Sequence, residues 1–169
     1  RLEQRYPTDT YAEPNYLLRN VEGKRFVDVS DVVGMRKLKN RVGRGTAFAD
    51  FDNDGDVDVL VTNKNDEPTL LRNDGGNRRN WLTIRTQGVQ SNRDGIGSRI
   101  KLKAGAYTTV QEVHFGSGYL SCHDPRLHFG LHQQPQVDQL QIEWLSGAVQ
   151  VFENLPANQE IVVTEPKLE

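Results

Sequence analysis

One short stretch of the sequence concentrates the residue types that bind hard cations. Residues 50–58 hold five of the chain's 23 acidic residues, placed at alternate positions of a nine-residue run. Carboxylates at the first, third, fifth and ninth positions can converge on one cation, and the backbone carbonyl of the seventh can add another oxygen. Gly55 permits the sharp reversal that this convergence needs. The acidic residues are Asp50, Asp52, Asp54, Asp56 and Asp58.

Oxygen ligands of this number and charge favour Ca²⁺. Mg²⁺ requires a stricter octahedron and retains more water, and Zn²⁺ would call for His or Cys ligands, which residues 50–58 lack. The run is not an EF-hand, because its twelfth position is Val61 rather than Glu and the flanking residues have strand character. The alternative is a solvated acidic turn, in which the crowded carboxylates would repel one another.

The residues around the acidic run predict short strands. Residues 46–51 and 57–62 are nearly continuous apolar runs, which favours strands buried on both faces. The first half also contains a short internal repeat, or echo. Leu17-Leu18-Arg19-Asn20 recurs 53 residues later as Leu70-Leu71-Arg72-Asn73, and each copy precedes a glycine turn. This spacing suits a β-propeller blade, and a chance repeat is the alternative. The first half is therefore predicted to hold about one blade, with strand edges that another copy or further blades must cover.

The second half shows the alternation of half-buried antiparallel strands. In residues 138–145, Leu140, Ile142 and Trp144 alternate with Gln and Glu. Together the runs predict a β-sandwich of about 90 residues and an all-β chain, with residues 31–40 as the one candidate for a short helix or an irregular loop. The other runs of this type are residues 81–86, 99–103, 108–113, 127–131, 148–152 and 160–164.

Composition excludes several classes of protein. The net charge is −2, so no overall field attracts the chain to nucleic acid. No apolar run approaches the roughly 20 residues of a membrane helix, so membrane insertion is not expected. The single cysteine, Cys122, excludes an intramolecular disulfide and zinc sites with two or more cysteines. The sequence starts at Arg1 rather than Met, from which a processed chain or a piece of a longer protein is expected.

Two further groups of residues could suggest chemistry. Cys122 lies beside His123, and His128 and His132 follow within ten residues. Their spacing does not fit a zinc site or a Cys-His pair, and a strand with Leu and Phe inward would turn His128 and His132 outward. Structural or solvated histidines are therefore favoured. Residues 36–44 are basic but lack the aromatic residues of a stacking nucleic-acid surface. They are interpreted as a solvated loop that could answer the acidic run, and a contact with an acidic partner or glycan is the alternative.

Residues 45–59 resemble the calcium-binding repeat of the FG-GAP/VCBS family, whose members build integrin-α-type β-propellers. The resemblance implies that Asp50, Asp52, Asp54 and Asp58 are side-chain ligands of Ca²⁺ and that Asp56 donates a carbonyl. The second half is similar to the ASPIC/UnbV domain, which follows such repeats. Its marks are Asn80-Trp81-Leu82 and residues 91–99, 116–121, 127–131 and 144–147.

Both resemblances together cover about residues 16–165 and imply a division into a blade segment, 1–79, and a sandwich, 80–169. The expected protein is a calcium-stabilised, non-catalytic binding or adhesion module, secreted or exposed on the cell envelope, that binds an extracellular protein or glycan. Further blades or a second copy are also expected partners. The alternative is a carbohydrate-active or other hydrolase domain that uses carboxylates such as Glu112 and Asp138.

Overall fold

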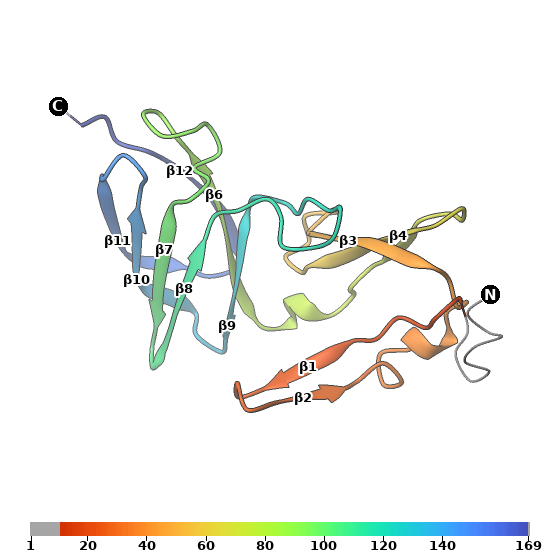
Figure 1. Cartoon of the computed structure of the whole chain (residues 1–169). Helices are drawn as coiled ribbons and strands as arrows, with labels where there is room; N and C mark the ends of the chain where they lie inside the picture. Colours follow the sequence, from red (N-terminus) through yellow and green to blue (C-terminus); the bar gives the residue numbers. More distant parts are fainter. Residues whose placement is uncertain (1–10, 169) are drawn as a thin grey trace. The chain divides into compact units, whose positions relative to one another are not determined.

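The computed structural model describes residues 11–168 as an all-β chain (Figure 1). Within that range the helices are two 3₁₀ turns, at Met35–Lys37 and Gly76–Arg78. The predictions of an all-β chain and of a short helix within residues 31–40 are confirmed. No helix among the described residues has the length and apolar character needed to span a membrane. The strands are β1 (Leu18–Val21), β2 (Arg25–Asp28), β3 (Gly43–Ala49), β4 (Asp58–Asn63), β5 (Thr69–Leu71), β6 (Asn80–Gln87), β7 (Arg99–Ala104), β8 (Tyr107–Glu112), β9 (Leu127–His132), β10 (Gln136–Glu143), β11 (Val149–Pro156) and β12 (Gln159–Thr164).

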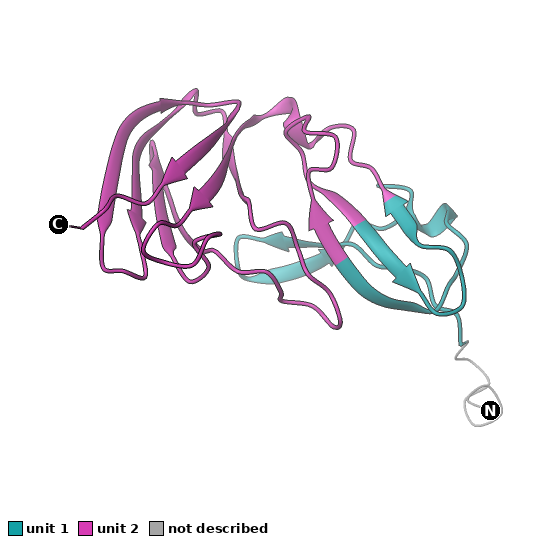
Figure 2. Cartoon of the chain, turned by 90° about the horizontal axis from the view of Figure 1, so that it is seen from above, with its two compact units in different colours: residues 1–46, 60–70 teal, residues 47–59, 71–169 magenta. Residues whose placement is uncertain are grey.

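The chain forms two compact units, which Figure 2 shows in different colours. Unit 1 comprises residues 1–46 and 60–70, and unit 2 comprises residues 47–59 and 71–169. The whole acidic run, residues 50–58, therefore belongs to the same unit as strands β6 to β12. Each unit is described below by itself.

Unit 2 contains two sheets that bury a common core. Their strand orders are β11-β10-β7-β8 and β12-β6-β9. The alternation expected in residues 138–145 is confirmed, because Leu140 and Ile142 are fully buried and Trp144 is 4% exposed. Each such side chain contributes about 1.5–3 kcal/mol when it leaves water. Other core residues are Leu82, Ile84, Ile100, Leu102, Phe129, Leu131 and Val163.

One strand pair departs from the antiparallel sandwich that the sequence predicts. Strand β12 pairs with β6 in parallel, with Gln159 opposite Leu82 and Thr164 opposite Gln87. The turn before β12 fixes this arrangement, because the N–H of Asn158 donates to the carbonyl of Trp81 and its Oδ1 accepts the Trp81 N–H at 3.1 Å. The other strand pairs of unit 2 are antiparallel.

A buried carboxylate fastens the end of β12 to the loop after β6. One oxygen of Glu165, which is 2% exposed, accepts the backbone N–H groups of Val89, Gln90 and Ser91 at 2.7, 2.7 and 2.8 Å. The other oxygen accepts the Ser91 hydroxyl at 2.7 Å. Burial alone would raise the pKa of Glu165, but hydrogen bonds from Ser146, Ser91 and the backbone lower it to about 2.

The strands of the first half form small sheets. Strands β1 and β2 make a hairpin, and β3, β4 and β5 make a three-stranded sheet. The two copies of the Leu-Leu-Arg-Asn echo lie at β1 and β5. Burial on both faces of β3 and β4 is wrong, because Phe48 is 44% and Leu60 is 38% exposed while Val61 is buried. Side chains in the described part of the chain cover only some of this apolar surface.

Candidate functional site

The acidic run forms the loop between β3 and β4, and its backbone turns sharply under an aromatic ring. Asn53 and Gly55 both have positive φ, 57° and 95°. A Cβ added at Gly55 would clash with the indole of Trp81 at the start of β6. Two constraints therefore require glycine at this position: the left-handed backbone conformation and the close approach of the Trp81 ring. The predicted reversal at Gly55 is confirmed.

Three of the predicted ligands come together. One carboxylate oxygen from each of Asp50, Asp52 and Asp58 lies within 4.8 Å of the others. Two oxygens that are each 2.3–2.6 Å from one Ca²⁺ are at most about 5 Å apart, so this spacing suits a shared cation. Asp50 and Asp58 are 8% and 2% exposed, and Asp52 is exposed.

Backbone hydrogen bonds hold the two buried members of this group. The oxygens of Asp50 accept the N–H groups of Asp54 and Gly55 at 3.1 and 2.9 Å. Those of Asp58 accept the N–H groups of Phe51 and Asn73 at 3.2 and 2.8 Å. A carboxylate oxygen can accept more than one bond, so each keeps a lone pair for a cation. The loop thus positions these two carboxylates with its own backbone.

The remaining two acidic residues have different environments. Asp54 lies outside the group of three, and its Oδ1 accepts the Asp56 N–H at 3.0 Å. The Asp56 side chain is 2% exposed, with Oδ2 accepting the Gly76 N–H at 3.0 Å and Oδ1 buried without a hydrogen-bond partner. Burial first, and then the charge of Asp54, raises the pKa of Asp56.

The donor set fits a hard cation. The grouped atoms are all carboxylate oxygens, and the loop also contains a buried carboxylate oxygen that no hydrogen bond satisfies. Buried, unneutralised carboxylates at this density are costly without a positive charge nearby. The sequence predicted Asp56 only as a carbonyl donor, so its buried carboxylate is an addition from the structure.

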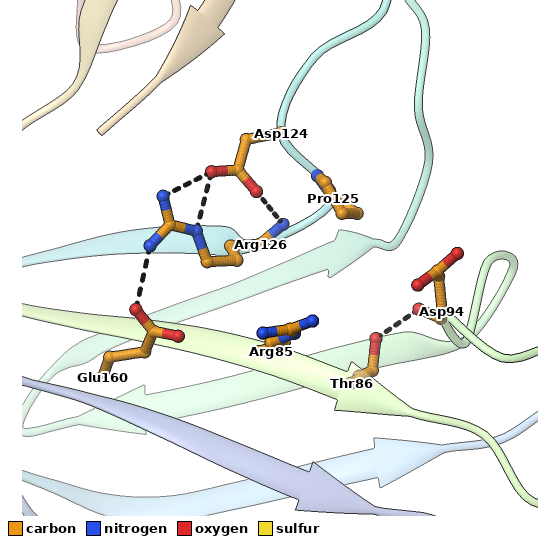
Figure 3. A pocket seen from close by; sticks show the side chains of 7 residues that line it. All are labelled: Arg85, Thr86, Asp94, Asp124, Pro125, Arg126 and Glu160. Carbon is orange, nitrogen blue, oxygen red and sulfur yellow. Dashed lines mark hydrogen bonds and ion pairs between the residues drawn. The ribbon is translucent and has the colours of Figure 1, made fainter. Parts of the chain in front are cut away.

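Arg126, just before β9, supplies a positive charge that the sequence did not predict for this loop. Its Nη2 donates to the carbonyl of Asp50 at 2.8 Å, and its Nη1 donates to Oδ1 of Asn53 at 2.7 Å. The same guanidinium pairs with Asp124 at 2.6 Å and with Glu160 of β12 at 2.9 Å (Figure 3). Arg126 therefore links the acidic loop to the segment before β9 and to strand β12.

The sequence contained no spacing signal for this contact, because Arg126 lies 76 residues after Asp50. Most of residues 36–44 are exposed, as expected for a solvated stretch. Three of their five cations pair within unit 1: Arg36 with Asp28 at 2.8 Å, and Lys39 and Arg41 with Asp66 at 3.3 and 3.5 Å.

The histidines lie in separate surroundings. His128 stacks on Trp81 at 6.0 Å between ring centroids, and its Nδ1 is 3.1 Å from the Thr83 hydroxyl. Burial lowers the pKa of His128, and the negative charge of Asp50 opposes that shift. His132 contacts the Tyr107 ring edge-on at 5.8 Å. Among the described residues, Asp50, Asp52 and Asp58 are the only set of three or more side chains placed to share a metal ion. The histidines therefore do not form such a set.

His123 makes the one contact that resembles part of a catalytic pair. Its Nε2 is 3.0 Å from the Ser117 hydroxyl, while its Nδ1 accepts the Phe48 N–H at 3.3 Å. A neutral imidazole that accepts at Nδ1 carries its proton on Nε2 and donates it toward Ser117. A general base for a serine nucleophile needs the opposite tautomer.

Glu112 and Asp138, the carboxylates of the hydrolase alternative, lie at opposite ends of β7. Glu112 pairs with Arg99 at the start of that strand, and Asp138 accepts the Gly105 N–H at 2.7 Å just after its end. At about 3.3 Å per residue the two are roughly 16 Å apart along the strand direction alone, and β7 lies between their strands. Carboxylate pairs that hydrolyse glycosides are separated by about 5–9.5 Å. The structure does not bring these two residues together.

Comparison with known proteins gives a family match for the second half. The protein-family model described as ASPIC and UnbV matches residues 88–169, so β6 and the acidic loop lie outside the matched segment. The chain is 32% identical to cartilage acidic protein 1 of Xenopus tropicalis over 117 residues, which cover 63% of this chain and 17% of that protein. It is 31% identical to the Homo sapiens protein of that name over 116 residues, 62% of this chain and 16% of that protein.

The aligned region thus spans about one sixth of the length of these curated relatives. Four of the five marks that suggested the resemblance fall inside the matched segment, whereas Asn80-Trp81-Leu82 precedes it; the four are residues 91–99, 116–121, 127–131 and 144–147. The segment from residue 88 to residue 169 matches the ASPIC and UnbV family.

Proposed function

We propose that this chain is a calcium-stabilised, non-catalytic binding module, and that Ca²⁺ is held by the acidic loop between β3 and β4. The supporting observation is that Asp50, Asp52 and Asp58 bring carboxylate oxygens within 4.8 Å of one another. Asp54 and the carbonyl of Asp56 are the further ligands that the FG-GAP/VCBS resemblance implies. Ca²⁺ would neutralise the carboxylates and hold the loop in its turn.

The same cation would stabilise the surface of the sandwich. The loop contacts Trp81 through Gly55 and holds Arg126 through the carbonyl of Asp50. A loop fastened to a rigid sheet can present a constant contact surface. We propose that this surface serves binding or adhesion to an extracellular protein or glycan.

We further propose that residues 1–79 are part of a β-propeller of the FG-GAP/VCBS type and that residues 80–169 form the ASPIC/UnbV-like sandwich. Strands β3, β4 and β5 support this, because they are adjacent in one sheet and the acidic loop joins the first two. A propeller blade has four strands. Further blades or a second copy of this chain are therefore partners that we propose for the first half.

We also propose a secreted or envelope-exposed location. Extracellular calcium modules work with a Kd of about 10⁻⁴–10⁻³ M, which only calcium-rich surroundings can fill. The similarity to proteins named for cartilage supports this location. The hydrolase alternative is less favoured, because Glu112 and Asp138 are far apart and His123 has the tautomer that does not activate Ser117.

Thermal unfolding with Ca²⁺ or with a chelator tests the calcium proposal. At a hundredfold excess over Kd, a ligand of the folded state adds about 2.7 kcal/mol, which corresponds to a rise in Tm of about 5–10 °C for a chain of this size. Mg²⁺ should raise Tm less. The variant Asp52→Asn should lose most of the calcium response without destabilising the metal-free protein, because Asp52 is exposed and makes no hydrogen bond in the described structure.

Asp31→Asn is the matched control, since it makes the same change on a side chain that is 88% exposed in unit 1. It should keep the full calcium response. The proposal is wrong if the wild-type Tm is equal in Ca²⁺ and chelator, or if Asp52→Asn responds as strongly as the wild type.

A further inference from the structure

A pocket of about 270 Å³ opens on unit 2 beside the Arg126 ion pairs. Figure 3 shows it over β6, with Arg85 between Glu160 on one side and Asp94 on the other. Arg85 points away from the core, because its strand neighbours Ile84 and Thr86 are buried while Arg85 is exposed. The pocket is separate from the carboxylates of the acidic loop. Its lining residues are Arg85, Thr86, Asp94, Asp124, Pro125, Arg126 and Glu160.

The Arg85 guanidinium has no hydrogen bond or ion pair within residues 11–168. The nearby carboxylates do not satisfy it, because Asp124 and Glu160 are both engaged by Arg126 at 2.6 and 2.9 Å. Arg126 in turn uses its nitrogens on these groups, on Asn53 and on the carbonyl of Asp50. The five N–H donors of Arg85 are thus available in a fork that matches a carboxylate.

Acceptors flank this guanidinium. The Asp94 backbone carbonyl accepts the Thr86 hydroxyl at 2.7 Å, and its carboxylate accepts no hydrogen bond from the described residues. Glu160 uses Oε2 for Arg126, and Oε1 remains available. The pocket therefore offers a free cationic fork with free anionic acceptors around it.

Three observations narrow the class of ligand. Two guanidinium groups and three carboxylates line the pocket, so its net charge of −1 disfavours phosphate and polyanions. The lining set contains no aromatic ring on which a sugar or a base could stack. The volume of about 270 Å³ suits a small molecule rather than a polymer segment.

We propose that this pocket binds a small zwitterion of the free α-amino acid type, a site beyond the calcium-binding and adhesive role. The ligand's carboxylate pairs with Arg85, and its ammonium group donates to the free carboxylate on one side of that guanidinium, Asp94 or Glu160. In this arrangement each charged group of the neutral zwitterion lies beside a pocket side chain of opposite charge. It also leaves the Arg126 ion pairs intact.

Amide chemical shifts of the full chain, titrated with L-serine, test this site. We expect saturable shifts at Arg85, Asp94 and Glu160 with a Kd of about 1 mM or tighter. Acetate and ethylammonium, which each carry one of the two charges, should bind at least about tenfold more weakly. The variant Arg85→Gln should lose saturable binding while keeping the overall spectrum of the folded protein.

Arg99→Gln is the matched control, because Arg99 is an exposed arginine of β7 in the other sheet of unit 2. It should bind L-serine as the wild type does. Binding of L-serine by Arg85→Gln would overturn the proposal. So would equal affinity for acetate, which would make this a simple carboxylate site, or binding of glucuronate without L-serine, which would make it a site for acidic sugars.

Discussion

Glu165 shows how one buried carboxylate can be kept ionised by backbone donors. Three consecutive N–H groups, from Val89 to Ser91, converge on one of its oxygens. Such a run of amides forms a small anion-binding concavity, and in this chain the anion is the protein's own side chain. The contact joins the end of β12 to the loop after β6 and therefore contributes to the stability of the whole sheet.

The pKa of Glu165 makes a signed prediction for pH. Because its pKa falls from 4.5 to about 2 on folding, its contribution is fully present above pH 4.5 and is lost as pH falls toward 2. At pH 7, Glu165→Gln should reduce the free energy of unfolding by about 1.5–3 kcal/mol, the range for hydrogen bonds to charged groups. Urea unfolding at a series of pH values should show the wild-type advantage shrinking between pH 4.5 and 2.

Glu153→Gln is the control for this experiment, since Glu153 is an exposed glutamate of β11. Its free energy of unfolding should follow that of the wild type at each pH. A wild-type advantage over Glu165→Gln that stays constant down to pH 2 would contradict the assigned role.

At the same scale, the sequence predicted the loop better than its surroundings. The alternating Asp residues and Gly55 pointed to a cation loop, because local spacing determines which side chains a short turn can gather. The structure brings Asp50, Asp52 and Asp58 together and leaves Asp54 outside that group. Burial of Asp56 depends on the loop near Gly76, a tertiary contact that no local pattern encodes.

Arg126 connects three elements of unit 2: the acidic loop, the segment before β9 and strand β12. It does so with hydrogen bonds to Asp50 and Asn53 and ion pairs to Asp124 and Glu160. Its side chain is 18% exposed, so these charged contacts are partly shielded from water. Hydrogen bonds to charged partners in such places are stronger than those on an open surface.

Replacing Arg126 should therefore loosen the acidic loop and the sandwich together. Arg126→Gln leaves Asp124 and Glu160 without their shared cation, and we expect a loss of about 2–4 kcal/mol in the free energy of unfolding. Calcium affinity should also fall, since the Asp50 backbone loses its anchor. Urea unfolding and calcium titration measure the two effects, with Arg99→Gln as the control.

An Arg126→Gln protein that matches the Arg99→Gln control in stability would show that the contacts contribute nothing net. Normal calcium affinity in a destabilised Arg126→Gln protein would show that calcium binding by the loop does not depend on the stability of the sandwich. Either result would contradict the link that we infer.

Strands were well predicted because their signal is local. In β10 the alternation of Leu140 and Ile142 with polar residues set one face inward, as the buried core confirms. The same reasoning failed for β3 and β4, where an apolar run suggested two covered faces but Phe48 and Leu60 are exposed. Apolar composition indicates what could be buried, whereas neighbouring strands decide what is buried.

At the scale of the whole molecule, the two tryptophans report on different parts of unit 2. Trp81 packs over Gly55 of the acidic loop, and Trp144 is buried in the core with its indole N–H donated to Gln150 at 2.7 Å. The chain has no other tryptophan. Each ring can therefore be observed alone after the other is replaced by Phe.

Chelation of calcium at low temperature should shift the emission of Trp81 toward the red, because a loosened loop exposes the ring to water. Trp144 should not respond until the core unfolds. The two signals are separated with the variants Trp144→Phe and Trp81→Phe. Identical responses of both variants to the chelator would mean that the loop and the core do not differ in calcium dependence, against our proposal.

The central strand of one sheet in unit 2 lies outside the family match. The family match covers residues 88–169, yet β6 lies before that segment and still forms the centre of a sheet in unit 2. The pairing of β6 with β12 could not be predicted, because it joins residues 77 positions apart in parallel while every local cue favoured antiparallel neighbours.

That pairing also sets the order of events when the chain is made. During synthesis β6 emerges before β7 to β11, but its partner β12 follows only after the rest of the sandwich. Until then one edge of β6 has unpaired N–H and C=O groups, and this half of the core lacks Val163. Contacts between residues so distant in sequence form slowly, since a long loop must close first. Nearly the whole domain must therefore be synthesised before both edges of its central strand, β6, can be paired.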